Sequence, residues 1–411
     1  MYNVAAGISL SFYDLFFILA FVKAIHRGRK TALTLNKPLF LLLCYLMFLI
    51  MISVVLGTSI GQLIYYARLY TTYTLFISLP FLVYKKEDFF KFIHLLFPIV
   101  FFIFASLVFT LFTSGHRFES FFLGDSAGGV GMYMTSRVME TIRPTGVSAL
   151  ILFFCYICSF FFLENKDYHG SRRYLYFIIS VSFLAILISA TRSWIVVFAA
   201  VFLFYSVGIS KLSPRFFVLV LSILAVLFAS YLSVPKLKHA LRMSLGRTST
   251  LTSLVQGDMT LENTSMRITQ RLPKVLNGIK QSPIIGLGLT DTYSKYGDYH
   301  VGNFNLILQA GIIGLLFFIN LWVNYFRMVL RARRQMPYSN NYRMPLLVLA
   351  GGFAGMLLLQ LTTYQLFGFT GVSRGDLFII IFYIVLSEFM VRYGIQENNR
   401  LKKLKKKEHE L

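Results

Sequence analysis

The sequence predicts an all-α integral membrane protein with about eleven transmembrane helices. Of its 411 residues, 56% are hydrophobic and only 14% are charged, whereas a soluble domain carries about 25% charged residues. Apolar runs of the ~20 residues that cross a bilayer as a helix recur along the chain. These runs lack the polar and apolar alternation that a transmembrane barrel requires. An α-helical membrane protein is therefore expected.

The apolar runs place each helix in order along a single polytopic domain, 1–411. Helices are expected near 4–24, 38–57, 59–83, 90–113, 144–164, 173–190, 192–208, 214–233, 303–326, 344–366 and 376–393. No basic segment precedes the first run, so we expect it to be retained rather than cleaved. Cys44, Cys155 and Cys158 fall inside predicted helices with no further Cys or His nearby. They are interpreted as packing residues, and no metal site or cofactor is expected.

The formal net charge of +23 is distributed as in a membrane protein, so nucleic acid is not an expected partner. Lys and Arg gather in alternate connections: about 23–37, 85–91, 166–173, 211–215, 327–343 and 392–407. The positive-inside rule then predicts a cytoplasmic C-terminus and an outer N-terminus. The basic tail, 394–411, is expected to bind anionic membrane lipids on the cytoplasmic side.

Two outer connections are long, 114–143 and 234–302, and long loops in compact proteins are usually functional. The second loop lies between the eighth and ninth helices, and its basic residues outnumber its acidic ones. A cationic outer surface suits an anionic ligand such as a phosphate or a pyrophosphate. Contact with lipid headgroups is the alternative for any single lysine.

Arg267 and Arg271 are the strongest anion-binding candidates in this loop. The stretch 266–280 is predicted to form an amphipathic helix, and the spacing of four places both arginines on one face. Two neighbouring guanidinium groups repel each other unless an anion or a carboxylate neutralises them. Arginine is also the residue expected to hold a diphosphate through paired hydrogen bonds.

Three further arginines are candidates for the same cavity. Arg192 opens a predicted helix, where it either contributes to a site or extends to the membrane interface. Arg68 lies about nine residues, or ~13 Å, into its predicted helix, a depth at which a charge normally faces a polar interior. Arg143 precedes Pro144, and this proline is interpreted as the start of the fifth helix.

His300 and Asn303 precede the ninth predicted helix. A histidine whose pKa lies near neutrality is a candidate general base for a sugar hydroxyl. The alternative is an interfacial histidine that caps the helix. Asn303 either caps the same helix or binds sugar hydroxyls.

The late part of the chain resembles the bacterial O-antigen polymerase and O-antigen ligase family. The residues that carry the resemblance are Gln281-Ser-Pro-Ile-Ile-Gly-Leu-Gly-Leu289, then His300, Asn303 to Leu308 and Gly311-Ile-Ile-Gly314. Ala190-Thr-Arg-Ser193 is similar to the family's "SR" helix start. Arg267, ten residues and Gly278 fit the RX10G pattern of the polymerases. One departure is His300-Val-Gly-Asn303, which stands where the family has an adjacent His-Asn pair.

This resemblance implies a GT-C-like membrane glycosyltransferase in the bacterial inner membrane, with a large helical periplasmic loop. The implied donor is a polyprenyl-diphosphate-linked oligosaccharide and the implied acceptor is a glycan, with no metal or nucleotide needed. Arg192, Arg267 and Arg271 would bind the diphosphate, and His300 would accept the proton of the acceptor hydroxyl. Arg68, Arg143 and Asn303 would line the substrate cavity. A chain-length regulator protein is a partner that the sequence leaves open.

A polysaccharide polymerase is the favoured function, because RX10G is a polymerase pattern. The nearest alternative is the ligase that moves O-antigen onto lipid A-core, which shares the donor and the chemistry. An alternative of another class is a flippase for the same lipid-linked glycan, which would have repeat symmetry and broken helices. A structural scaffold is a weaker alternative, because it would not explain Arg68 or the loop arginines.

Overall fold

The computed structural model describes most predicted helices and the second half of the large loop. The described ranges are 2–4, 8–10, 35–61, 63–64, 86–112, 133–136, 141–144, 146–189, 191–209, 267–298, 301–337, 340–362, 366–368 and 374–410, with single positions at 15, 18, 19, 22, 23, 26 and 225. The chain forms two compact units. Unit 1 comprises 1–89, 265–335 and 360–411, and unit 2 comprises 90–264 and 336–359.

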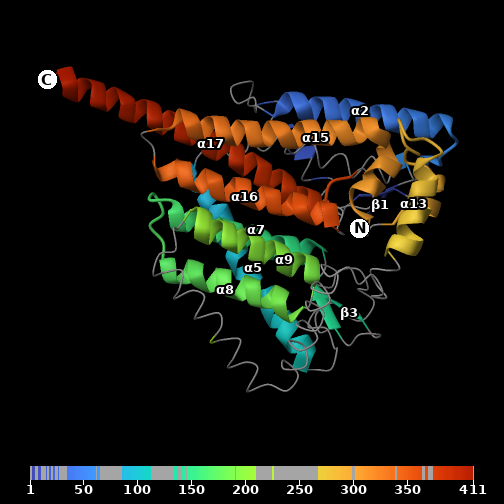
Figure 1. Ribbon diagram of the computed structural model, residues 1–411, viewed down its shortest axis with the longest axis horizontal. Helices are drawn as coiled ribbons and strands as arrows, with labels where there is room; N and C mark the ends of the chain where they lie inside the picture. Colours follow the sequence, from blue (N-terminus) through green and yellow to red (C-terminus); the bar gives the residue numbers. More distant parts are fainter. Residues whose placement is uncertain are drawn as a thin grey trace. The chain divides into compact units, whose positions relative to one another are not determined.

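Unit 1 contains three long helices, α2 (Asn36–Val55), α15 (Asn303–Gln335) and α17 (Arg374–Glu410), which lie side by side in Figure 1. The second half of the large loop adds a π-helical turn η1 (Arg267–Arg271) and the short helices α13 (Leu272–Ile279) and α14 (Asp291–Tyr296). The short helices lie at the end of unit 1 where α15 begins and α2 ends (Figure 1).

The opposite end of unit 1 gathers the helix ends that are predicted to be cytoplasmic. The backbone N–H of Leu35, before α2, donates to the buried carboxylate of Glu388 on α17 at 3.4 Å. The side chain of Asn398 on α17 donates to the carbonyl of Gln335 at the end of α15 at 3.1 Å. The start of α2 and the ends of α15 and α17 therefore share one side, as the charge pattern requires.

Helix α15 is broken at Gly311, which has φ of 64° and ψ of −173°. The break separates a first segment, 303–310, from a long second segment, 312–335. A positive φ is accessible to glycine at little cost, whereas it is strained for residues with a Cβ atom. The chain therefore changes direction at a glycine, which tolerates the conformation.

Unit 2 is built around α7 (Gly146–Glu164), α8 (Arg172–Ile188) and α9 (Arg192–Gly208). It also holds most of α5 (Lys86–Phe112) and of α16 (Asn340–Thr362), whose remaining residues belong to unit 1. The core is aromatic: Tyr156 and Phe198 have ring centroids 4.6 Å apart, and those of Phe160 and Tyr205 are 4.2 Å apart. Cys155 and Cys158 are buried free thiols in α7, as expected of packing residues.

Unit 2 also places predicted cytoplasmic connections together. Asp167, between α7 and α8, accepts hydrogen bonds from Asn341 at 3.2 Å and from Tyr342 at 3.0 Å. Both donors lie in the first turn of α16. The connection between α7 and α8 and the start of α16 therefore share one end of this unit, as the predicted topology requires.

The predicted spans are confirmed in part. Among the described residues, α2, α5, α15, α16 and α17 are long and apolar enough to cross a membrane, and α7 and α9 are shorter apolar helices. Together with α8, they match eight of the predicted spans. The predicted spans 59–83 and 214–233 lie almost wholly outside the described residues. The protein is therefore a multi-pass membrane protein, and the total of about eleven crossings stays a prediction.

Two expectations near helix starts are wrong. The first span was expected from residue 4, but Tyr2–Val4 (β1) pairs antiparallel with Ile8–Leu10 (β2). Both segments alternate apolar, polar and apolar residues, a strand period. Pro144 does not start a helix, because it ends β4 (Thr141–Pro144), which pairs with β3 (Tyr133–Ser136), and α7 begins at Gly146.

Candidate functional site

The predicted amphipathic helix of the large loop is present as η1 followed by α13. Pro273 lies in the first turn of α13, directly after the turn η1. The five residues before α13, Arg267 to Arg271, form the wider π-helical turn. Such π turns are rare and occur often at functional sites. Both candidate arginines are therefore held at the two ends of one irregular turn.

One face of α13 is buried and the other is polar, which confirms the predicted amphipathicity. Val275 and Gly278 are buried, whereas Lys274, Asn277 and Lys280 are exposed. A Cβ atom on Gly278 would lie 2.5 Å from Cδ1 of Leu308 and 2.7 Å from Cβ of Tyr296. The glycine of the RX10G pattern thus allows α13 to pack closely on α15.

The two glycine-rich motifs of the resemblance pair with each other through the backbone. Leu287 and Gly288 donate N–H groups to the carbonyls of Leu308 and Gln309 at 2.8 and 3.0 Å. In return, Ile312 and Ile313 donate to the carbonyls of Pro283 and Ile284 at 3.0 and 3.2 Å. We call these paired segments, 283–288 and 308–313, the glycine junction. The junction supplies backbone partners across the break in α15.

Glycine is required at two positions of the glycine junction. Gly286 has φ of 82°, and a Cβ there would lie 2.5 Å from the backbone of Gln309 and Ala310. Gly311 has φ of 64°, and a Cβ there would overlap the carbonyl oxygen of Ile284. Both neighbours are backbone atoms, which cannot move aside as a side chain does. The motif glycines are therefore explained by close backbone approach.

Helix α2 fixes the glycine junction from one side. The hydroxyl of Tyr45 donates to the carbonyl of Ala310 at 2.6 Å and lies 3.3 Å from that of Ile285. Near the end of α2, the Ser53 hydroxyl accepts a hydrogen bond from the backbone N–H of Leu289 at 2.9 Å. One helix therefore contacts both segments of the junction.

A buried polar cluster lies beside the junction. The hydroxyl oxygen of Tyr293 on α14 accepts hydrogen bonds from the side-chain amides of Asn305 and Gln309, both at 2.7 Å. Both amide residues are fully buried in the first segment of α15. The Oδ1 atom of Asn305 in turn accepts from the backbone N–H of Asp298 at 3.3 Å. The cluster therefore connects α14, α15 and the loop that follows α14.

Arg271 has a carboxylate neighbour. Its Nε atom lies 3.7 Å from Oδ2 of Asp298, and both side chains are partly exposed. The separation is too long for a hydrogen bond, so the attraction is Coulombic. The carboxylate that the sequence predicts as one way to neutralise this arginine pair is therefore present for Arg271.

Asn303 is the first residue of α15, and its Oδ1 atom is buried. Within the described part of the chain this oxygen finds no hydrogen-bond donor, so Asn303 does not cap α15 through it. The capping interpretation is therefore wrong for this atom. A buried acceptor without a donor is costly and is suited to a ligand hydroxyl.

Arg143 and Arg192 both stand near helix starts at one end of unit 2. Helices α7 and α9 run in the same direction, because Phe153 contacts Trp194 and, further along, Glu164 accepts a hydrogen bond from Tyr205 at 2.7 Å. The starts of both helices therefore lie at the same end. Arg143 stands three residues before α7, and Arg192 is the first residue of α9.

The remaining predicted site residues are placed in part. Arg267 and Arg271 belong to η1 and Asn303 to α15, all in unit 1, whereas Arg143 and Arg192 belong to unit 2. The structure describes only the backbone of Arg143, Arg192 and Arg267, and His300 and Arg68 lie outside the described residues. The convergence of these residues around one ligand stays a prediction.

Sequence reasoning missed the polar cluster and the partner of Arg271. Asn305 and Gln309 are four residues apart inside an apolar run, a spacing that indicates one polar face on a membrane helix. That signal was available. Asp298 had no comparable signal, because its pairing with Arg271 depends on the fold of the intervening loop.

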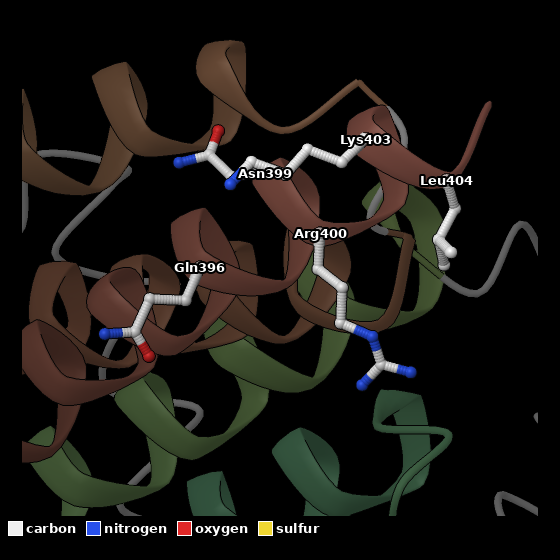
Figure 2. A pocket seen from close by; sticks show the side chains of 5 residues that line it. All are labelled: Gln396, Asn399, Arg400, Lys403 and Leu404. Atoms are coloured by element: carbon white, nitrogen blue, oxygen red, sulfur yellow. The ribbon is translucent and has the colours of Figure 1, made fainter. Parts of the chain in front are cut away.

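A hollow of about 450 Å³ lies on the tail part of α17, lined by Gln396, Asn399, Arg400, Lys403 and Leu404 (Figure 2). Asn398, between these residues, contacts the end of α15, so the hollow is at the end of unit 1 opposite η1 and α13. Arg400 pairs with Glu397 at 3.7 Å. These cations match the predicted basic tail and do not belong to the candidate site.

The fold defines a multi-pass helical membrane protein. At one end of its unit 1, the broken helix α15 begins, and Arg271 of η1 lies near Asp298. No protein-family model matches the chain, and no curated protein matches it.

Proposed function

We propose that this protein is an O-antigen or capsular polysaccharide polymerase that joins polyprenyl-diphosphate-linked repeat units on the periplasmic side of the bacterial inner membrane. The observation that carries the proposal is the glycine junction. The motif segments of the resemblance, 283–288 and 308–313, are hydrogen-bonded to each other, and Gly278 packs α13 against the same helix. Segments that form one local structure fit a common functional unit better than isolated coincidences do.

Each site residue has a role in the proposed transfer step. Arg192, Arg267 and Arg271 hold the donor diphosphate and neutralise the negative charge that grows on it as it leaves. The acceptor hydroxyl oxygen forms a bond to the anomeric carbon of the donor sugar, while the bond from that carbon to the diphosphate oxygen breaks. His300 accepts the hydroxyl proton. Asn303, whose buried oxygen has no donor among the described residues, contacts the glycans together with Arg68 and Arg143.

The arrangement of helix ends supports the topology that this chemistry needs. In unit 1, the end that carries Arg271 is opposite the end that carries Asn398 and the basic tail. With the tail in the cytoplasm, as the positive-inside rule predicts, α13 and the glycine junction face the periplasm. The lipid tail of the donor enters between helices from the bilayer. No metal or nucleotide takes part in the proposed steps.

The direct test is chain growth in variants of the arginines. In a strain that lacks the native gene, Arg267→Ala and Arg192→Ala are expected to abolish the glycan ladder while the level of membrane-inserted protein persists. Lys274→Gln removes an exposed cation of α13 and is the matched control, with the ladder retained. Near-normal glycan ladders in both arginine variants would contradict the proposal that these arginines bind the diphosphate.

The same deletion strain separates the polymerase from the ligase. Loss of a polymerase leaves lipopolysaccharide that bears single repeat units, whereas loss of a ligase leaves bare core. The polymerase and the ligase use the same donor and the same chemistry, so the site residues fit either enzyme. The RX10G pattern favours the polymerase.

The break in α15 keeps the flippase as a second candidate, because transporters build substrate sites at broken helices. Proteoliposomes with labelled lipid-linked repeat units distinguish the two. A polymerase lengthens the glycan when donor and acceptor are on the same side as α13. A flippase moves the label across the bilayer without lengthening it.

A further inference from the structure

We propose that Asp298 is an internal counter-ion that pairs with Arg271 when no diphosphate is bound. This pairing lowers the affinity of the site for the diphosphate. The proposal rests on the proposed function, because it assumes that Arg271 binds a phosphate-bearing ligand. It assigns a role to a residue outside the predicted site, and it makes Asp298 a positioning residue that acts through Arg271.

The geometry of the pair leaves Arg271 available to a ligand. Its contact with Asp298 is made at Nε, at 3.7 Å, which is beyond hydrogen-bond distance. The guanidinium group has five N–H donors, and a Coulombic contact of this length does not consume them. The side chain of Arg271 is 36% exposed and that of Asp298 is 20% exposed, so an anion can approach the arginine from solvent.

Asp298 is held in place by its backbone rather than by the arginine. Its N–H donates to Asn305, and its carbonyl accepts from the N–H of Val301 at 3.2 Å. Asn305 is itself fixed by its hydrogen bond to Tyr293 in the buried cluster. The Asp298 backbone is therefore held near Arg271 by contacts that do not involve the arginine.

A fixed carboxylate opposes an incoming diphosphate in two ways. It attracts the guanidinium group, and it repels the ligand, because both carry negative charge. A partly exposed pair of this kind contributes little to folding but changes the binding of a charged ligand. The same repulsion favours release of the diphosphate product, which a repeating polymerase must achieve after every addition.

The test measures binding of inorganic pyrophosphate to the full-length protein in nanodiscs at fixed ionic strength. Replacing Asp298 with Asn removes the competing charge and keeps the side-chain shape, so the affinity is expected to rise about two- to fivefold. Asp298→Glu retains the charge and is expected to bind as the wild type does. Arg271→Ala is expected to weaken binding about tenfold or more.

Two controls isolate the pair. Glu397→Gln removes a carboxylate from the Arg400 ion pair, which has the same 3.7 Å separation, at the other end of unit 1. This variant changes the net charge by the same amount and is expected to leave the affinity unchanged. In the Arg271→Ala background, Asp298→Asn is expected to change the affinity by less than about 1.5-fold, because its effect acts through the arginine.

The outcomes separate this role from the proposed function. Weaker binding in Arg271→Ala with unchanged or weaker binding in Asp298→Asn overturns the counter-ion role and leaves the diphosphate site. Equal binding by the wild type and Arg271→Ala, or no binding by the wild type, overturns both. If Asp298→Asn does not fold, Asp298→Ser gives the same comparison, with Asp298→Glu as the charge-retaining reference.

Discussion

The glycine junction of unit 1 joins a loop, 283–288, to a broken helix, whereas the α7–α9 bundle of unit 2 joins unbroken helices, and the two regions are held together differently. In the bundle, apolar side chains pack on each other, with aromatic ring pairs between α7 and α9 such as Phe153 and Phe198, whose centroids are 5.3 Å apart. In the junction, backbone groups on 283–288 bond to those on 308–313, and glycines allow the close approach.

The difference indicates where a membrane protein tolerates change. Apolar rings fill space, and their neighbours relax when a volume changes. Backbone hydrogen bonds at a broken helix have fixed geometry, and an unpaired group in an apolar surrounding is costly. The junction should therefore be sensitive to single atoms, whereas the bundle should be tolerant.

The largest effect is expected for Gly311→Ala. The new Cβ atom would overlap the carbonyl oxygen of Ile284, and the positive φ adds backbone strain. We expect a loss of about 3–5 kcal/mol, seen as failure to fold or a large fall in Tm in detergent. Gly61→Ala is the control, because no atom of the described residues lies within 4 Å of its added Cβ. Equal Tm values for the two variants would remove the steric explanation of the break.

A smaller effect is expected for Tyr293→Phe. The variant keeps the ring but leaves the amide donors of Asn305 and Gln309 without the hydroxyl that both contact at 2.7 Å. A loss of about 2 kcal/mol is expected, because two buried hydrogen bonds are removed. Thermal unfolding of the purified protein measures it. Removing the donors as well, in a triple variant with Asn305→Leu and Gln309→Leu, should recover part of the loss. Without such recovery, the polar cluster would not be the cause.

A direct comparison of the two regions uses one glycine from each. A Cβ on Gly278 would lie 2.5 Å from Leu308, whereas a Cβ on Gly355 of unit 2 would lie 3.0 Å from Phe153 and 3.1 Å from Val197. We expect Gly278→Ala to cost about 1–2 kcal/mol and Gly355→Ala less than about 1 kcal/mol. Tm shifts of the two variants, measured side by side, check the order. A larger shift for Gly355→Ala would reverse the comparison.

The smallest losses of stability are expected when the hydroxyl of Tyr45 or of Tyr156 is removed. Tyr45 donates to Ala310 at the break, and Tyr156 donates to the carbonyl of Phe198 at 3.2 Å. The carbonyl of Phe198 lies inside α9, where it also accepts a helical N–H. Tyr45→Phe should therefore cost about 1 kcal/mol and Tyr156→Phe about 0.5 kcal/mol. Matched unfolding curves test this, and equal losses would show that the junction is not specially sensitive.

Most of the helices could be predicted from the sequence, because apolar length is a local property. The break in α15 could not, since the run 303–326 has the length of one continuous membrane helix, and the break depends on partners about 25 residues earlier. The β1–β2 hairpin was missed because its two strands of three residues merge with an apolar run that is long enough for a helix.

The candidate site was predictable in its residue types rather than in its contacts. The amphipathic pattern of 266–280 correctly predicted which face of α13 is buried. The π-helical form of Arg267–Arg271 and the pairing of Arg271 with Asp298 depend on tertiary structure. Charge spacing indicates that an anion or a carboxylate is needed, and only the fold decides which carboxylate is near.

The central claim is that arginines of the outer loop and of α9 bind a lipid-borne diphosphate, and affinity for polyprenyl diphosphate in nanodiscs tests it most directly. The full-length protein is expected to bind polyprenyl diphosphate at least about tenfold more tightly than polyprenyl monophosphate, and both Arg192→Ala and Arg271→Ala should remove this preference. Equal affinity for the two lipids, or a preference that survives both substitutions, would contradict the account.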